Sequence, residues 1–429
     1  MRAPNILSRL TRITTAGRNY IPQIDGLRFV AIMAVVAYHV RGVCLHYFGI
    51  DAHPGDPISR CFEAGHYGVQ LFFAISGFVL SLPFARQLLC SAPPQPPGQA
   101  PAVSLKEYYL RRLTRIEPPY VIHLAVLLML CVLVYRRLPA HPHLYHNPEW
   151  AKFTATHLLA SLIYSNGFIF GTHPYPNYVL WSLEVEVQFY LLAPWLAKML
   201  LVRNATARRI LLLGLVGVFS VGAYLWQPYR AWASLVGNLQ YFLVGFLLSD
   251  LYVNGKLSTS PSSSSSSSST TKAGPGFLQR TFNNLWRSLR EGWLWDAGFL
   301  SSCAAVVWLQ EERAIQWVLP WAIFLCGVAA FLGVASRRFL GNPWITTIGG
   351  MCYTIYLYHS LMISLLARLL LKVQTHLLPL DLLTQFVLMS AAIIAVCAVL
   401  FAWLERPFMR RDWPGRLRHR MQAKVLPAR

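Results

Sequence analysis

Residues 24–40 read IDGLRFVAIMAVVAYHV, and this stretch decides the fold class. It lies inside a longer apolar segment, about 22–46, which is long enough to cross the roughly 30 Å hydrocarbon core of a bilayer as one helix. A basic stretch containing Arg2, Arg9, Arg12 and Arg18 precedes it, and no small-residue cleavage pattern follows it. We therefore expect an uncleaved first membrane span rather than a signal peptide.

Nine further apolar segments of spanning length follow the first one. They lie at about 66–84, 117–136, 178–200, 209–227, 232–252, 293–309, 314–334, 345–370 and 382–404. Of the 429 residues, 55% are hydrophobic and 13% are charged, whereas soluble domains carry about a quarter charged residues. The sequence thus predicts an all-α, polytopic membrane bundle of about ten transmembrane helices.

The net charge of +21 is distributed unevenly along the chain. If the N-terminus is cytoplasmic, most of the 38 lysines and arginines fall in the inner segments. Cytoplasmic loops attract such an excess, so we predict cytoplasmic N- and C-termini. We attribute the charge to orientation and lipid contact, not to nucleic-acid binding.

One membrane domain accounts for nearly the whole chain. We expect a basic cytoplasmic arm at 1–20, the membrane domain at 21–410 and a basic cytoplasmic tail at 411–429. A Ser-rich stretch at about 254–276 is typical of a flexible linker and interrupts the membrane domain on its inner side.

Arg28 and His39 are the best candidates for a buried site, because polar groups inside a bilayer are costly. They are eleven residues apart, which puts them about 20° apart around a helix and about 16 Å apart along its axis. His39 suits a general base, and Arg28 suits an anionic or carbonyl oxygen of a substrate. Asp25 lies one turn before Arg28. Alternatively, Arg28 snorkels and pairs with Asp25 while His39 bonds a neighbouring helix.

Three arginines gather in YYLRRLTRIEPPY, residues 108–120. Arg111, Arg112 and Arg115 stand at the cytoplasmic start of the predicted third span. They are either ordinary positive flanks of a span or a docking site for phosphates, which arginine binds with a forked geometry.

The predicted fourth span is polar at its start, where WSLEVEVQFYLL covers residues 181–192. Glu186 and Tyr190 share a helix face, and Trp181 marks the membrane interface. We expect Glu186 at the depth of His39, where its carboxylate would orient the histidine or bind sugar hydroxyls. The alternative is a polar clamp between helices.

The ninth span contains CYTIYLYHS, residues 352–360. Tyr356 and His359 are three apart and can line one wall of a cavity, although packing explains such stripes equally well. In the second span, Ser76 and Gly77 interrupt a bulky run and favour close helix packing. The sequence contains no P-loop, GxSxG or HExxH motif and no metal-ligand spacing, so we expect no metal site.

Taken in order, these motifs resemble the acyltransferase-3 family of membrane O-acyltransferases. The matching elements are DGLRFVAIMAVVAYH, GVQLFFAISGF, YYLRRLTRIEPPY, WSLEVEVQFYLL, CYTIYLYHS and ERP, which span about residues 20–410. Cys352 and Tyr358 depart from the family pattern, which commonly has Ser and Trp there.

The resemblance implies an acyl-CoA donor, acetyl-CoA in particular, and a carbohydrate or lipid-linked glycan as acceptor. It implies a bacterial inner membrane and the short form of the family, without a soluble esterase-like domain. Arg28 and His39 carry over as the essential pair, with Glu186 as a third catalytic residue. Arg111, Arg112 and Arg115 carry over as donor-facing, and the expected substrate-binding residues are Asp25, Trp181, Tyr190, Tyr356 and His359.

The resulting hypothesis is an O-acyltransferase in which His39, assisted by Glu186, deprotonates the acceptor hydroxyl. One rival is a transporter or flippase of glycan intermediates that uses His39 and Glu186 as a proton relay. We find no internal repeat, which many transporters have. A scaffold would leave Arg28, His39 and Glu186 without a purpose. The sequence leaves the acceptor, the acyl chain and the oligomeric state open.

Overall fold

Helices are the only regular secondary structure over the residues that the structure describes. A computed structural model describes residues 10–13, 20–50, 55–90, 104–137, 148–225, 233–255, 257, 277–410 and 413. These residues form helices and no strand, which confirms the predicted all-α class. Most of the predicted Ser-rich linker and of the two basic terminal arms lies outside the described residues.

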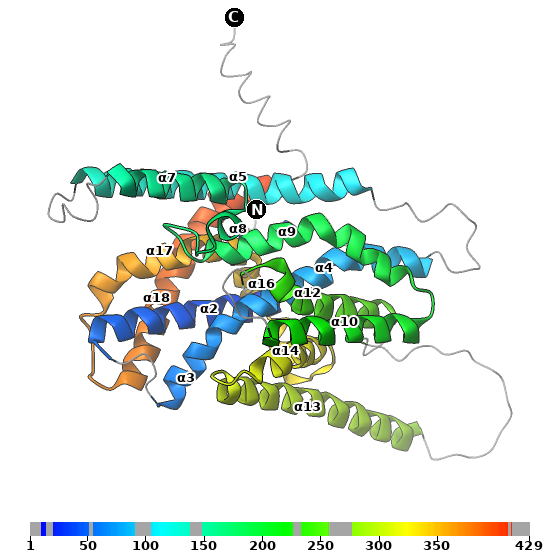
Figure 1. The fold of residues 1–429 in the computed structure, drawn as a ribbon. Coiled ribbons are helices and arrows are strands. Elements are labelled where there is room, and N and C mark those ends of the chain that lie inside the picture. The colour runs from blue at the N-terminus through cyan, green and yellow to red at the C-terminus, as the bar shows by residue number, and fades with distance from the viewer. Residues whose placement is uncertain are drawn as a thin grey trace, which may run out of the picture.

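Figure 1 shows the helices packed together in one bundle. In chain order they are α2 (Pro22–Phe48), α3 (Pro57–Glu63), η2 (Ala64–Tyr67), α4 (Gly68–Cys90), α5 (Leu105–Arg137), α7 (Pro148–Leu162), α8 (Asn166–Phe170), α9 (Leu180–Leu196), η3 (Ala197–Leu201), α10 (Ala205–Leu225), α12 (Leu235–Val253), α13 (Phe277–Leu309), α14 (Ile315–Leu332), α15 (Ala335–Leu340), α16 (Pro343–Gly350), α17 (Cys352–Leu370), α18 (Leu378–Leu400), η4 (Phe401–Glu405) and η5 (Arg406–Met409).

Within the described ranges, nine helical runs are long and apolar enough to cross a membrane. They correspond to nine of the ten predicted spans. The remaining one, predicted at 178–200, is α9, which has 17 residues and continues into η3. Its first half carries Glu184, Glu186 and Gln188, so it brings polar side chains into the bundle. The chain is a multi-pass membrane protein.

Helix α2 contributes side chains to two hydrophobic cores. One core includes Leu27 and Val35 of α2 and packs them among side chains of α4, α12 and α14. The other includes Ile32, Val36 and Val40 and packs them among side chains of α5, α17 and α18. Because α2 packs into both cores, its polar residues Asp25 and Arg41 are buried inside the bundle.

Two glycines allow helices to approach closely at this centre. A Cβ atom at Gly77 of α4 would overlap the carbonyl oxygen of Phe242 of α12, so the close packing predicted for Gly77 is confirmed. A Cβ atom at Gly349 of α16 would overlap the carbonyl oxygen of Asp25 in α2. Any larger residue at Gly349 would therefore displace the end of α2 that carries Asp25.

The other end of α2 is held by a buried ion pair. The Nε atom of Arg41 donates to the hydroxyl of Ser59 at 2.8 Å, and its Nη2 atom lies 3.1 Å from a carboxylate oxygen of Glu63. Arg41 is buried, and both partners belong to α3. Helix α2 is thus fixed to its neighbours at both ends.

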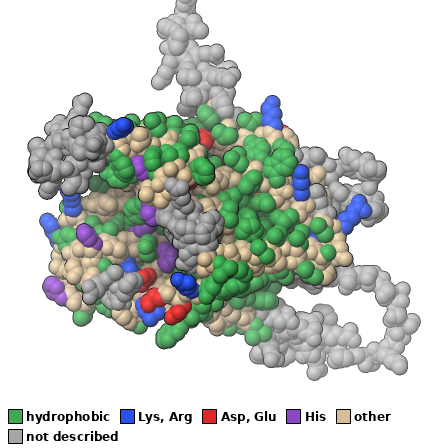
Figure 2. Space-filling model, viewed as in Figure 1, with side chains coloured by type: hydrophobic (Ala, Val, Ile, Leu, Met, Phe, Trp, Pro, Cys, Tyr) green, Lys and Arg blue, Asp and Glu red, His purple; other side chains and the backbone are tan. Residues whose placement is uncertain are grey.

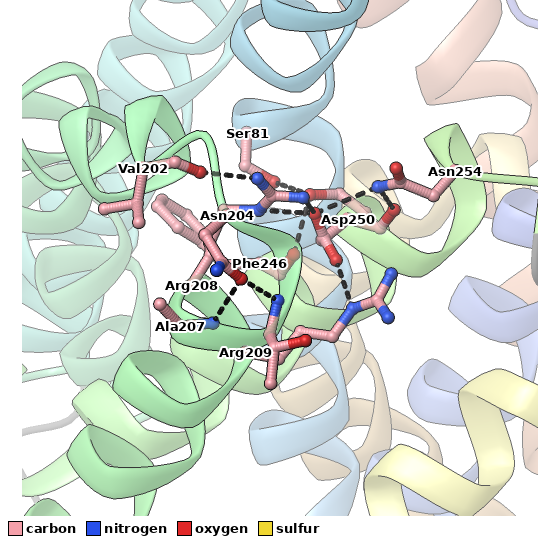
Figure 3. Close-up of polar contacts among 11 residues, drawn as sticks. Ser81, Val202, Asn204, Ala207, Arg208, Arg209, Phe246, Asp250 and Asn254 are labelled. Carbon is pink, nitrogen blue, oxygen red and sulfur yellow. Dashed lines mark hydrogen bonds and ion pairs between the residues drawn. The ribbon is translucent and has the colours of Figure 1, made fainter.

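A second buried ion pair joins α10 to α12 (Figure 3). Asp250 accepts from Nε of Arg208 at 2.7 Å and from Nε of Arg209 at 2.8 Å. The side-chain amide of Asn254 donates to the same carboxylate at 3.1 Å. Arg208 also donates to the carbonyl oxygen of Val202 at 2.6 Å, so its guanidinium group is satisfied on two sides.

Outward-facing side chains are largely apolar. Figure 2 shows hydrophobic side chains over much of the visible face, with lysines and arginines toward its edges. Exposed large hydrophobic residues lie on α10, α17, α18 and η4, among them Ile210, Val218, Leu369, Val387 and Trp403. Such a surface suits contact with lipid rather than water.

Candidate functional site

Arg28 and Asp25 form an ion pair on the first span, as their spacing predicts. The Nη1 atom of Arg28 lies 2.5 Å from a carboxylate oxygen of Asp25, which is 2% exposed. The same carboxyl group accepts from Arg12 at 3.2 Å and from the hydroxyl of Tyr20 at 3.1 Å. Two arginines and a phenol therefore converge on one buried acid, which leaves a net positive charge at this point.

Two adjoining cavities open beside this cluster. The first, which we call the deep cavity, has a volume of about 170 Å³ and is enclosed by residues of α2, α4, α5, α9 and α17. The second, the vestibule, has a volume of about 400 Å³ and lies nearer the two terminal segments. They share six lining residues, which are Arg12, Arg28, Val79, Arg111, Arg112 and Arg115. The three arginines of the 108–120 motif thus face the same space as Arg28.

Positive charge exceeds negative charge along this space. Arg115 lies 3.8 Å from Glu405, whereas the guanidinium group of Arg112 lies 5.0 Å from the centre of the Tyr108 ring. Among the ion pairs of the described residues, none involves Arg112. Burial, together with the charges of Arg115 and Arg28, lowers the pKa of Arg12. A bound polyanion would relieve this mutual repulsion.

Glu186 belongs to the deep cavity. Its Oε1 atom accepts from the hydroxyl of Tyr190 at 2.5 Å and from the hydroxyl of Ser76. Both partners line the same cavity, together with Arg28. The predicted proximity of Glu186 and Tyr190 is therefore found, and Ser76 joins them.

His39 lies next to His359, and its contacts differ from those of Glu186. The two imidazole rings have centroids 5.0 Å apart and are tilted by 31°. The Nδ1 atom of His39 lies 3.2 Å from the hydroxyl of Tyr178. His359 is fully buried, and its Nδ1 atom lies 2.7 Å from the carbonyl oxygen of Tyr356. Because that nitrogen must donate to a carbonyl, the Nε2 atom of His359 is left as an acceptor, and it is buried without a protein partner.

Tyr356 stands between the deep cavity and the histidine pair. Its ring lines the deep cavity and has its centroid 5.7 Å from that of His359. Its hydroxyl lies 2.5 Å from that of Ser182 and donates to the carbonyl oxygen of Val179. The cavity and the histidines are therefore neighbours across one aromatic side chain.

The structure places three of the predicted site residues as follows. Among the described contacts, Glu186 hydrogen-bonds to Ser76 and Tyr190 and lines the deep cavity with the arginines, and none of these bonds is with His39, so its role in orienting the histidine stays a prediction. Trp181 is buried against Phe73 and is not among the residues lining the two cavities. His359 is likewise not among those residues, although it contacts His39.

Sequence reasoning missed two residues of the site. Arg12 was interpreted only as part of a basic arm, because its contact with Asp25 depends on how that arm returns to the bundle. Tyr178 precedes the WSLEVEVQFYLL motif, and no helical spacing in the sequence relates this tyrosine to His39. Within the described ranges, no group of three or more His, Cys, Asp and Glu side chains is arranged to hold a metal ion.

Fold and site together define a class of protein: a multi-pass membrane protein with an arginine-lined cavity beside a pair of histidines. The chain belongs to the acyltransferase-3 family, since a family model described as an acyltransferase domain matches residues 21–402. The motifs of the sequence indicate the same family.

Curated relatives carry related activities in their names. The chain is 24% identical over 352 residues to the O-acetyltransferase OatA of Staphylococcus aureus, an alignment that covers 79% of this chain and 50% of the relative. It is 28% identical over 189 residues to the peptidoglycan O-acetyltransferase OatA of Listeria monocytogenes, covering 43% of this chain and 25% of that relative. The chain thus spans half or less of the length of these relatives. No solved structure matches it significantly.

Proposed function

We propose that this chain transfers an acetyl group from acetyl-CoA to a hydroxyl of a cell-envelope glycan in a bacterial inner membrane. The observation that carries the proposal is the excess of arginine over carboxylate in the deep cavity and vestibule. Coenzyme A carries phosphates at one end and the thioester at the other, and arginine binds phosphate with paired hydrogen bonds. The names of the relatives favour a glycan acceptor such as peptidoglycan.

In the proposed arrangement the donor enters from the cytoplasmic side. The distribution of lysine and arginine supports this orientation, because the arginines of the 108–120 motif then stand at the inner end of α5. Arg111, Arg112 and Arg115 hold the phosphates, and Arg12 and Arg28 add positive charge further in. The pantetheine arm then points past Glu186 toward Tyr356.

His39 is the proposed general base of the transfer. It takes the proton of the acceptor hydroxyl while that oxygen attacks the thioester carbonyl, so that a C–O bond forms and the C–S bond breaks. Coenzyme A leaves as a thiolate and takes up the proton, which returns His39 to its neutral form. Glu186 keeps a positioning task within the cavity by accepting from Ser76 and Tyr190.

Binding of coenzyme A tests the donor site directly. We expect purified wild-type protein in nanodiscs to bind coenzyme A by calorimetry, and Arg112→Ala to weaken that binding about 10- to 100-fold. A charge-assisted hydrogen bond contributes roughly 1.5–3 kcal/mol, which corresponds to that range. Arg112 is chosen because it makes no ion pair within the described residues, so its loss strands no carboxylate.

Arg203→Ala is the matched control for that experiment. It removes one positive charge from an exposed residue that lies outside both cavity linings, so binding should stay within about twofold of wild type. An equal loss of coenzyme A affinity in the two variants would mean that the effect comes from net charge alone. A wild-type protein that binds no coenzyme A would contradict the donor assignment and favour the carrier hypothesis.

Cys352 provides an independent probe of occupancy, because it lines the deep cavity. We expect desulfo-coenzyme A, which has no thiol of its own, to slow the modification of Cys352 by a small methanethiosulfonate reagent. The exposed Cys61 and Cys303 should react at unchanged rates, since they lie outside the cavity. Peptide mass spectrometry measures each site. If saturating desulfo-coenzyme A left the rate of Cys352 modification unchanged, the ligand would bind outside the deep cavity.

A further inference from the structure

Tyr178 is the described hydrogen-bond partner of His39. Its hydroxyl lies 3.2 Å from Nδ1 of His39, and the two rings meet edge to face with centroids 5.3 Å apart at an interplanar angle of 75°. His359 stands 5.0 Å from His39, centroid to centroid, as a second ring neighbour. Among the described contacts, three rings bound the imidazole of His39, those of Tyr38, Tyr178 and His359, and only Tyr178 hydrogen-bonds to it.

The backbone on both sides of Tyr178 is anchored. The amide group of Asn177 lies 3.1 Å from Nε2 of His123 in α5 and donates to the carbonyl oxygen of Leu357 in α17 at 3.3 Å. On the other side, the carbonyl oxygen of Val179 accepts from the hydroxyl of Tyr356. Asn177 and Val179 are both buried. These bonds fix the turn before α9, so Tyr178 has little freedom to move away from His39.

We propose that Tyr178 is the positioning residue of His39 and performs the task that the sequence analysis assigned to Glu186. This inference rests on the proposed function. In it, Nδ1–H of His39 donates to the phenolic oxygen, which fixes the ring and leaves Nε2 with the lone pair that takes the acceptor proton. When the imidazole becomes charged, the same bond remains and stabilises the cation.

A phenol suits this position for a physical reason. A carboxylate beside His39 would place a second charge in the membrane interior, where an unpaired anion is costly. A neutral hydroxyl orients the imidazole without that cost. Tyr178 is also 44% exposed, which leaves room beside it for an acceptor sugar to approach.

The test compares Tyr178→Phe with Tyr38→Phe. Both rings lie edge-on to His39, at 5.3 Å and 5.0 Å between centroids, but a hydroxyl–His39 bond exists only for Tyr178 among the described contacts. We expect Tyr178→Phe to lower kcat of acetyl transfer about 10- to 100-fold with an unchanged KM for acetyl-CoA, because the base is misaligned and the donor site is intact. Tyr38→Phe should keep the wild-type kcat. Tyr178→His, which restores a hydrogen-bonding ring, should recover part of the loss.

The outcomes separate this inference from the proposed function. Wild-type kcat in Tyr178→Phe, or an equal loss in Tyr38→Phe, would overturn the positioning role while leaving acetyl transfer established. A loss of folding in Tyr178→Phe would show as a lowered unfolding temperature. In that case Tyr178→His tests the positioning role, and a folded Tyr178→His variant that recovers none of the lost kcat overturns the inference. If the wild-type protein transfers no acetyl group at all, the proposed function itself fails.

Discussion

His39→Ala should abolish acetyl transfer while leaving coenzyme A binding close to wild type. The two effects separate because His39 is not among the residues that line the deep cavity or the vestibule, and Tyr356 stands between it and the arginines. General-base catalysis contributes about 10²- to 10⁴-fold to rates, so the rate of acetyl transfer in the variant should be lower than that of wild type by this factor. The measurement is the glycan acetate content of a deletion strain complemented with each variant, together with calorimetry on the purified proteins.

His173→Ala is the control, since it removes an exposed imidazole from the segment between α8 and α9. It should restore acetylation like the wild type at equal membrane expression. Full restoration by His39→Ala would return His39 to the role of a packing residue and remove the mechanism proposed above. If deletion left the glycan acetate unchanged, the acceptor class would be wrong and the carrier hypothesis would gain support.

Asp250→Ala is expected to destabilise the protein by about 3–5 kcal/mol, the cost of leaving a buried charge without its partner. Arg208 and Asp250 are both at most 9% exposed by side chain, and Asp250 joins two arginines of α10 to α12 (Figure 3). Removing the carboxylate leaves the guanidinium groups of Arg208 and Arg209 facing each other in the bundle. Thermal unfolding in detergent, followed by the loss of helical signal, measures the effect.

Glu311→Gln is the matched control for this stability experiment. Its carboxylate lies 3.8 Å from Arg60 and is 55% exposed, so the change should cost no more than about 1 kcal/mol. A similar shift in both variants would mean that the Asp250 network contributes no more than a surface pair. In that case α10 and α12 would be held by apolar packing alone.

Helical periodicity was enough to predict the polar face of α2. Arg28, Asp25 and His39 occupy the helix and the relative positions that a 100° step gives them, because a helix between two apolar cores keeps its regular geometry. The arginines of the 108–120 motif also face the same cavity as Arg28. Local spacing and hydropathy therefore predicted most of the bundle and the arginine-rich half of the site.

The rest of the site depends on contacts between distant segments. The contact of Glu186 with Ser76 depends on how α9 packs against α4, and no pattern within either helix predicts that contact. The contact of Arg12 with Asp25 requires the arm before α2 to fold back, and Tyr178 reaches His39 across 139 positions of sequence. Long-range packing determines such pairs, so motif spacing alone could not predict them.

Helix α2 is fixed at both ends: Asp25 contacts Gly349, and Arg41 bonds Ser59 and Glu63. The helix therefore sets a constant distance between the residues that it carries. The roughly 16 Å of helix between Arg28 and His39 cannot shorten to suit a smaller donor. A donor with a truncated arm would dock by its phosphates and hold its acyl carbon out of reach of the acceptor. Such a molecule would behave as a competitive inhibitor, and the length of the arm would matter more than the chemistry of the acyl group.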